Sequence, residues 1–169
     1  LPKSLIVVGS GAIGCEFANF YVNMGVKVIL LEGLERILPV EAAELGKIAH
    51  KSFEKQGMVI KTSVKLKSLT KTKTGVKLEL ENETLEAEKL IMAVGVTPNT
   101  SGLNLEGVGV KLTPKNLVET SPFMQTATSN IFAIGDITEG PWLAHKASHE
   151  GVIAAEKIAS LEGKIDSKK

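Results

Sequence analysis

The sequence predicts an α/β fold, a doubly wound parallel sheet that carries a small antiparallel meander as an insertion. Two observations support this prediction. Continuous apolar runs alternate with helix-like segments up to about residue 63, as expected for buried parallel strands joined by helical crossovers. From residue 64 to 88 apolar and polar positions alternate instead, which is typical of half-buried antiparallel strands.

The first part of the chain supplies a strand–helix–strand–helix–strand unit. The expected elements are a strand that begins at Leu5 and ends at a glycine-rich turn, helices at 12–24 and 41–56, and strands at 27–32 and 58–62. Both helices carry apolar residues at helical spacing, which predicts their buried faces. These residues are Ile13, Phe17, Ala18 and Tyr21 in the first helix and Leu45, Ile48, Ala49 and Phe53 in the second.

The meander follows this unit. Short strands are expected at 64–72, 76–81 and 84–88. In the second of them, Val76, Leu78 and Leu80 are predicted to share a buried face while charged residues take the other. Residues 90–94 are fully apolar again and predict a parallel strand that rejoins the sheet.

A domain boundary is expected near residues 97–99, where Gly, Pro, Asn and Thr replace the apolar pattern. We therefore assign residues 1–97 to one domain and 98–169 to a second segment. This segment is expected to hold a short strand at 131–134, a helix at 143–161 that Gly163 ends, and a polar tail from residue 164. The predicted buried side of that helix consists of Ala147, Val152, Ala155, Ile158 and Ala159.

Composition excludes several function classes. With 43% hydrophobic residues and a net charge of +1, the chain of 169 residues can form a core but has no electrostatic footprint for nucleic acid or an acidic membrane. The sequence shows no signal-peptide pattern, and no apolar run approaches the roughly 20 residues of a membrane span. The single cysteine, Cys15, excludes an internal disulfide framework and a Cys-rich metal site, and we expect a small buried thiol.

Gly9, Gly11 and Gly14 form a G-x-G-x-x-G motif between the first strand and the first helix. In this context Gly9 allows the tight turn, Gly11 lets a pyrophosphate approach the backbone, and Gly14 lets the helix pack closely on the sheet. The unpaired N–H groups of the first helical turn then favour phosphate binding. The motif therefore predicts a dinucleotide site; the alternative is a glycine-rich turn of another α/β protein.

Glu32 ends the second apolar strand at about the 20-residue spacing after the glycines that is typical of the carboxylate binding an adenosine ribose. A carboxylate accepts hydrogen bonds from ribose hydroxyls and repels a 2′-phosphate, so NAD is favoured over NADP. Arg36 lies nearby and could serve a phosphate, but Glu32 comes first at the strand end. The alternative for Glu32 is a solvated loop carboxylate.

A second signal is the stretch IFAIGDI, in which an apolar run ends in a glycine and Asp136, with a helix soon after. A carboxylate at such a strand end commonly faces a ligand crevice. The alternatives are a turn aspartate or a helix cap.

Several motifs together resemble one family. They read GSGAIGCEFA, VILLE, LERILP, AVGVTPNT, IFAIGDI and LAHKASHEG. The chain resembles the dihydrolipoamide dehydrogenase family of pyridine nucleotide–disulfide flavoenzymes nearly end to end. The resemblance covers only the middle of that architecture, a Rossmann-like NAD domain and the segment that returns to the FAD domain. Together with the start at LPKS, immediately before a core strand, this indicates a fragment of a longer chain.

The resemblance implies two cofactors, NAD and FAD, and a set of residues for each. Asp136 matches the aspartate that binds the ribityl chain of FAD, and the following helix would point its positive end at the flavin. The full FAD set is Asp136, Trp142, Leu143, Ala144 and His145. The NAD set is Gly9, Ser10, Gly11, Ala12, Ile13, Gly14, Glu16, Glu32, Val64 and Gly95, with Glu16 matching the glutamate near the nicotinamide.

Some positions depart from the family pattern. Val96 and Thr97 stand where Arg-Arg is frequent, and Trp142 stands where methionine is usual. The family's redox-active Cys pair has no counterpart in this sequence, because Cys15 is the single cysteine. Its His-Glu acid/base pair has none either, because His145 and His149 lie in the flavin-proximal helix. We therefore assign no catalytic residue and no metal ligand.

The leading hypothesis is that the parent protein oxidises dihydrolipoamide, passing electrons through a disulfide and FAD to NAD, while this chain alone is inactive. The resemblance implies a lipoyl-carrying protein of 2-oxoacid dehydrogenase complexes as a partner, a homodimeric parent, and a bacterial cytoplasm or mitochondrial matrix as its compartment. Two alternatives remain. One is a mercuric reductase or NADH oxidase of the same superfamily, and the other is a free-standing NAD-binding module without chemistry.

Overall fold

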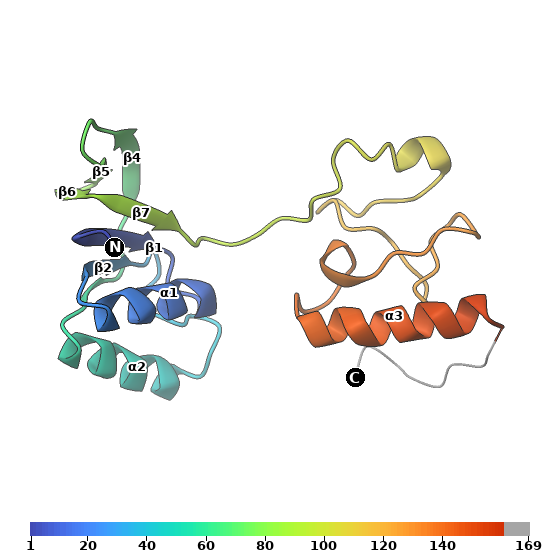
Figure 1. The fold of residues 1–169 in the computed structure, drawn as a ribbon, viewed down its shortest axis with the longest axis horizontal. Coiled ribbons are helices and arrows are strands. Elements are labelled where there is room, and N and C mark those ends of the chain that lie inside the picture. The colour runs from blue at the N-terminus through green and yellow to red at the C-terminus, as the bar shows by residue number, and fades with distance from the viewer. Residues whose placement is uncertain (161–169) are drawn as a thin grey trace. The chain divides into compact units, whose positions relative to one another are not determined.

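A computed structural model describes residues 1–160 of the chain. The chain divides into two compact units, the first covering Leu1–Gly95 and the second beginning at Val96 (Figure 1). Each unit has its own hydrophobic core. Within residues 1–160, no helix combines the length and the apolar character needed to cross a bilayer.

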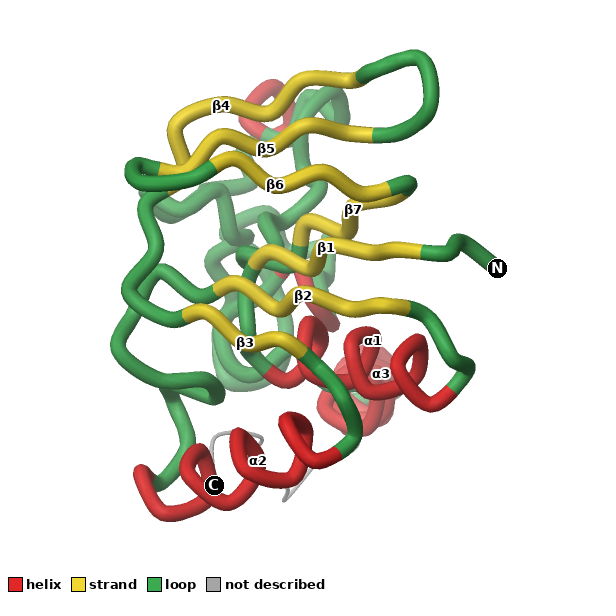
Figure 2. The backbone as a smooth tube through the Cα atoms, turned by 90° about the vertical axis from the view of Figure 1, so that its left-hand side faces the viewer, coloured by secondary structure: helices red, strands yellow, loops and turns green. Residues whose placement is uncertain are grey.

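The first unit is built on a parallel sheet with strand order β3-β2-β1-β7 (Figure 2). Its strands are β1 (Ser4–Val8), β2 (Lys27–Leu31), β3 (Val59–Lys61) and β7 (Lys89–Met92), and its helices are α1 (Ala12–Asn23) and α2 (Ala43–Lys55). Val8 at the end of β1 lies opposite Leu31 on one side and Met92 on the other. Because the strands are parallel, the loops that follow β1, β2, β3 and β7 leave the same edge of the sheet.

Strand β1 is buried on both faces, which explains why its sequence is apolar without alternation. Leu5 and Val7 pack into one core cluster with α1 and α2. Ile6 and Val8 pack into a second cluster on the opposite face, with the antiparallel strands. The parallel sheet therefore lies between a helical layer and the meander, and the predicted α/β class is confirmed.

The meander has strand order β4-β5-β6, and all of its pairs are antiparallel. Its strands are β4 (Leu66–Lys71), β5 (Val76–Leu80) and β6 (Thr84–Ala87). Leu78 and Leu80 are buried against β1, with Val76 partly buried beside them, so the predicted inward face of β5 is confirmed. The predicted return to the parallel sheet is confirmed too, because β7 pairs with β1.

The predicted buried faces of α1 and α2 are wrong in part. Ile13 and Phe17 of α1 are 51% and 46% exposed, and Leu45 and Ile48 of α2 are also exposed. The buried stripe of α1 consists instead of the small residues Gly14, Cys15 and Ala18. Small side chains let a helix approach a sheet closely, so the contact is narrower than the apolar face that helical spacing predicts. Ala18, Tyr21, Ala49 and Phe53 do contact the core as predicted.

The described part of the second unit, residues 96–160, has little regular strand structure. Its elements are the 3-10 turns η1 (Glu106–Val108) and η2 (Gly135–Ile137) and the helix α3 (Ala144–Ile158). The predicted strand at 131–134 is wrong, because only Phe132 of that stretch makes a β-bridge, with Gln125, and η2 follows directly. An isolated bridge lacks the neighbouring pairs that make a ladder, so the apolar run crosses the core as irregular chain.

The predicted buried side of α3 is also wrong. Val152 and Ile158 are 49% and 66% exposed, and Ala155 and Ala159 are exposed as well, while Ala147 is half-buried. The buried face consists of Lys146, Glu150, Ile153 and Ala154. Two charged residues occupy core positions here because they pair with each other, which a hydrophobic pattern cannot indicate. The expected helix end at Leu161 and Gly163 and the tail from residue 164 lie outside the described residues.

Candidate functional site

The glycine-rich loop between β1 and α1 has the geometry that its motif predicts. Gly9 has a φ of +96°, a conformation that side-chain-bearing residues rarely adopt. A Cβ at Gly9 would overlap the carbonyl oxygen of Ala93 on β7's exit loop, and a Cβ at Gly14 would overlap the carbonyl oxygen of Gly9. At Gly11, by contrast, nothing lies within 4 Å of the position that a Cβ would occupy, so the backbone there faces open space.

The start of α1 offers hydrogen-bond donors toward that open space. The first backbone bond of the helix runs from the N–H of Cys15 to the carbonyl of Gly11, at 3.0 Å. The N–H groups of Ala12, Ile13 and Gly14 therefore have no acceptor within the described chain. Free N–H groups and the positive end of the helix dipole favour an anion at this position.

Glu32 lies beside this loop, immediately after β2, and is only 9% exposed. Its Oε2 accepts hydrogen bonds from the N–H and the hydroxyl of Ser10, at 2.9 and 2.6 Å, and its Oε1 accepts one from the N–H of Leu34 at 2.9 Å. Burial alone would raise the pKa of this carboxyl, but the hydrogen bonds from Ser10, Leu34 and Gly33 outweigh burial and hold the pKa below its ordinary value. Glu32 is therefore a buried, ionised acceptor, and a solvated loop carboxylate does not fit this environment.

Ser10 has a role that the motif did not predict. Its side chain is fully buried, and its carbonyl accepts the N–H of Leu38 at 2.9 Å and the thiol of Cys15 at 3.2 Å. Ser10 thus joins the glycine loop to both Glu32 and the loop after β2. The only sequence signal was a hydroxyl inside the G-x-G motif, which by itself does not indicate a contact with Glu32.

Cys15 is the small buried thiol that the sequence predicts. Burial, with a further contribution from the negative charge of Glu32, raises its pKa from 9.0 to about 11. The thiol therefore stays protonated near neutral pH and is no nucleophile.

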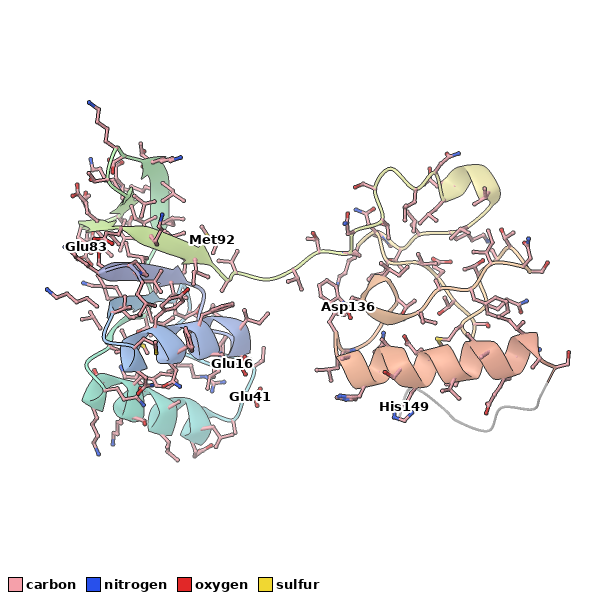
Figure 3. The ribbon with its side chains drawn as sticks, viewed as in Figure 1. Glu16, Glu41, Glu83, Met92, Asp136 and His149 are labelled. Carbon is pink, nitrogen blue, oxygen red and sulfur yellow. The ribbon has the colours of Figure 1, made fainter. Side chains whose placement is uncertain are left out.

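The remaining residues of the predicted NAD set lie near the same sheet edge or on α1. Val64 is half-buried after β3, and its N–H donates to the carbonyl of Glu32 at 3.0 Å. Gly95 is exposed after β7, and Glu16 is exposed on α1, where Figure 3 labels it. Arg36 donates to the carbonyls of Pro39 and Glu41 at 2.8 and 2.9 Å, so its guanidinium is used within its own loop.

These features together fit a dinucleotide. The loop provides an open approach to bare backbone at Gly11, free N–H groups at a helix start and a buried carboxylate at the end of the neighbouring strand. This is the donor and acceptor set that a pyrophosphate and a ribose require.

The second unit brings the predicted FAD residues close to the start of α3. Asp136 lies in η2 with an exposed side chain (Figure 3). Trp142 is half-buried, and Leu143, Ala144 and His145 form the exposed beginning of the helix. The first backbone bond of α3 runs from Ala147 N–H to the carbonyl of Leu143, which leaves the preceding helical N–H groups free within the described chain.

Two residues that sequence reasoning missed connect η2 to α3. Lys146 Nζ donates to the carbonyl of Gly135 at 3.0 Å, and Glu150 Oε2 accepts the N–H of Gly135 at 2.7 Å. Opposite charges four residues apart on a predicted helix were the available signal, but such pairs are normally solvated. Among the described residues, no group of three His, Cys, Asp or Glu side chains could hold a metal ion.

Comparison with protein families and curated proteins gives consistent matches. The model of the pyridine nucleotide-disulphide oxidoreductase family matches residues 1–151. A dihydrolipoyl dehydrogenase from Rhizobium etli is 46% identical over 166 residues, which cover 95% of this chain and 34% of that protein. A dihydrolipoyl dehydrogenase from Geobacillus stearothermophilus is 41% identical over 98% of this chain and 36% of its own length. The chain thus spans about a third of the length of these relatives.

Solved structures of similar proteins agree. LpdA from Mycobacterium tuberculosis superposes with a TM-score of 0.86 at 34% identity, over 95% of this chain and 35% of that one. The HOCl-induced flavoprotein disulfide reductase RclA from Escherichia coli superposes with a TM-score of 0.92 at 27% identity, over 99% of this chain and 38% of that one.

Proposed function

Because this chain belongs to the pyridine nucleotide-disulphide oxidoreductase family, we propose that its first unit binds NAD and its second unit forms part of an FAD site. The family match supports the oxidoreductase class and the two cofactors that the sequence predicts for the parent protein. We propose NAD binding for the domain expected at residues 1–97 and flavin contact for the segment at 98–169. The activity proposed for the parent is the oxidation of dihydrolipoamide.

The observation that carries the NAD proposal is the Glu32–glycine loop arrangement. Ser10 donates two hydrogen bonds to Oε2, while Oε1 accepts the N–H of Leu34 at 2.9 Å and no bond from a side chain within the described residues. We therefore propose that an adenosine ribose hydroxyl donates to Oε1. The pyrophosphate would be bound by the free N–H groups at the start of α1, where Gly11 leaves the backbone accessible. A 2′-phosphate would meet an ionised, buried carboxylate, which disfavours NADP.

The flavin proposal rests on η2 and the start of α3. Asp136 would accept hydrogen bonds from the hydroxyls of the ribityl chain, and residues 142–145 would contact the ring largely through backbone atoms. When bound, the flavin supplies the relay between a disulfide and the nicotinamide. The N-terminal end of α3 would favour negative charge that develops beside it.

The parent's chemistry needs groups that these residues do not supply. Cys15 is buried and protonated, and His145 and His149 are exposed on α3. We therefore propose that the redox disulfide and the acid/base pair lie elsewhere in a longer protein, and that this chain alone has no turnover. The partner we propose is a lipoyl-carrying protein of a 2-oxoacid dehydrogenase complex, with a homodimeric parent in a bacterial cytoplasm or mitochondrial matrix.

A second candidate has a different substrate within the same superfamily. The high structural similarity to a flavoprotein disulfide reductase supports it, because the described residues bear on cofactor binding rather than on substrate choice. The mercuric reductase and NADH oxidase alternatives belong to this candidate. Dihydrolipoamide-dependent NADH formation by the full-length protein would favour the first proposal, and its absence would favour the second. A free-standing NAD module predicts instead that no longer parent protein exists and that the region after Gly95 folds without FAD.

The NAD proposal is tested by calorimetric titration with NADH and NADPH. We expect a clear preference for NADH, and we expect Glu32→Ala to weaken NADH binding by about tenfold and to reduce the preference. Glu86→Ala, which removes an exposed carboxylate on β6, serves as the matched control and should leave both affinities unchanged. Equal affinities of the unmodified protein for the two nucleotides would contradict the proposal.

A further inference from the structure

A buried ion pair lies under the turn that carries Asp136. Lys146 and Glu150 are one helical turn apart on α3, with Nζ and Oε1 at 3.1 Å, and their side chains are only 7% and 3% exposed. Thr138, at the end of η2, is also buried. These three side chains surround Gly135, the residue immediately before Asp136.

The network uses the hydrogen-bonding groups of Gly135 completely. Its N–H donates to Glu150 Oε2 at 2.7 Å. Its carbonyl accepts from Lys146 Nζ at 3.0 Å and from the Thr138 hydroxyl at 2.8 Å. Lys146 Nζ also donates to Thr138 Oγ1 at 3.0 Å, so its three N–H groups all have partners. The backbone of η2 is therefore attached to α3 at both its donor and its acceptor.

Local backbone geometry accommodates this attachment. Gly135 has a φ of +77°, which permits the turn that directs both of its polar groups toward α3. Gly140 has a φ of +118°, and a Cβ there would lie 2.9 Å from Cε of Lys146. Gly140 thus leaves room for the lysine side chain to pass beneath the loop.

The pair is better explained by position than by stability. Removing two charges from water is costly, and a buried ion pair often adds no more stability than apolar residues of similar volume. This pair instead holds the backbone of η2, the turn that carries the exposed side chain of Asp136. A buried network that is fully satisfied specifies one arrangement of its parts.

We propose that Lys146 and Glu150 are positioning residues for flavin binding. They hold Asp136 at a fixed distance from the free N–H groups at the start of α3, so that the carboxylate and the helix terminus act on the flavin as one rigid set. The proposal rests on the proposed function, because it assumes that Asp136 faces FAD.

The test compares flavin affinity with apoprotein stability in the full-length protein. The variants are Lys146→Met, Glu150→Gln and the double variant, and the measurements are the Kd for FAD, from flavin fluorescence, and the Tm of the apoprotein. Each single variant leaves a buried charge or donor unpaired, so we expect a lower Tm and weaker FAD binding. In the double variant no charge is left unpaired, so the Tm should return close to that of the unmodified protein.

The double variant distinguishes an effect on the Kd for FAD from an effect on the Tm of the apoprotein. It lacks the Lys146 hydrogen bonds to Gly135 and Thr138, so we expect its Kd for FAD to stay at least about tenfold higher, as for other residues that orient a ligand-binding group. Lys61→Met with Glu83→Gln, which removes an ion pair in the first unit, is the matched control and should leave the Kd unchanged. Recovery of unmodified FAD affinity together with Tm would overturn the proposal.

A neutral substitution provides an independent measurement should the charge variants fold poorly. Thr138→Val removes the shared hydroxyl and should weaken FAD binding, while Thr138→Ser should restore it. Equal FAD affinity of Thr138→Val and the unmodified protein would contradict the positioning role and leave the proposed flavin function intact. An unmodified full-length protein that binds no FAD would overturn the proposed flavin function as well.

Discussion

The two units hold a carboxylate in position beside a helix N-terminus in different ways. Each presents a carboxylate close to a helix N-terminus, Glu32 near α1 and Asp136 near α3. In the first unit the carboxylate itself is buried and held by Ser10. In the second unit the carboxylate is exposed, and a buried residue, Glu150, holds the backbone that carries it. The first site is oriented through a side chain and the second through a turn.

This difference predicts which changes each site tolerates. A site oriented through a side chain depends on the loop that contacts it, so backbone changes in the glycine loop should have the largest effects. A site oriented through a turn depends on residues behind it that never touch the ligand.

The largest effect is expected for alanine at two positions of the glycine loop. Gly14→Ala should destabilise the protein by about 2 to 3 kcal/mol, because the new methyl group overlaps the carbonyl of Gly9. Gly11→Ala should change stability by less than about 0.5 kcal/mol, because its methyl group meets open space. That same methyl group should weaken NADH binding by about tenfold, since it fills the approach to the backbone.

Urea unfolding and calorimetry with NADH measure the two quantities. Normal NADH affinity in a folded Gly11→Ala variant would contradict our account of the open space as the pyrophosphate approach.

A smaller effect is expected at the contact between Ser10 and Glu32. Ser10→Ala should lower the free energy of unfolding by about 1.5 kcal/mol, because it removes one hydrogen bond to a charged group and keeps the backbone bond. Combined with Glu32→Gln in a double-mutant cycle, it should show a coupling energy above about 0.5 kcal/mol. Urea unfolding of the four proteins gives this energy, and additive effects would show that the 2.6 Å contact contributes little.

The acid stability of the first unit should reflect Glu32. Its folded pKa lies below the ordinary value of 4.5, so its ionised form stabilises the fold above that value. This contribution is lost as the pH falls through the lowered pKa. Glu32→Gln should therefore be less stable than the unmodified protein at pH 7, and the difference should shrink below pH 4.5. Unfolding curves across this range test the sign, with Glu86→Gln as the exposed control.

The smallest effect concerns Cys15. Because burial raises its pKa to about 11, we expect no alkylation by iodoacetamide at about pH 8 in the folded protein and rapid alkylation after unfolding. Mass spectrometry of the peptide that contains Cys15 distinguishes the two states. Rapid alkylation of Cys15 in the folded protein would contradict its burial beside Ser10 and Glu32.

The first unit could be predicted from the sequence to a greater extent than the second. The parallel strands, the meander and the conformation of Gly9 follow from local patterns, because each apolar period reports directly on a sheet face. The exposure of Ile13 and Phe17 on α1 could not be predicted from helical spacing, because the helix contacts the sheet through the small residues Gly14, Cys15 and Ala18.

The second unit depends on contacts between distant residues. The apolar stretch at 131–134 reads as a strand, but it lacks the neighbouring pairs that a ladder requires. Opposite charges at the spacing of Lys146 and Glu150 are normally solvated, and their burial depends on their contact with each other and with Gly135, which the sequence does not indicate. Hydropathy describes single residues, whereas η2 and α3 of this unit are joined by hydrogen bonds between buried polar groups that lie far apart in the sequence.

The stretch from Val94 to Thr97 joins the two cores and has every side chain exposed. Such a stretch is a preferred substrate for proteases, since its backbone can enter a protease cleft without disturbing either core. Brief digestion should therefore yield two resistant pieces, each suitable for separate calorimetry and NMR spectroscopy.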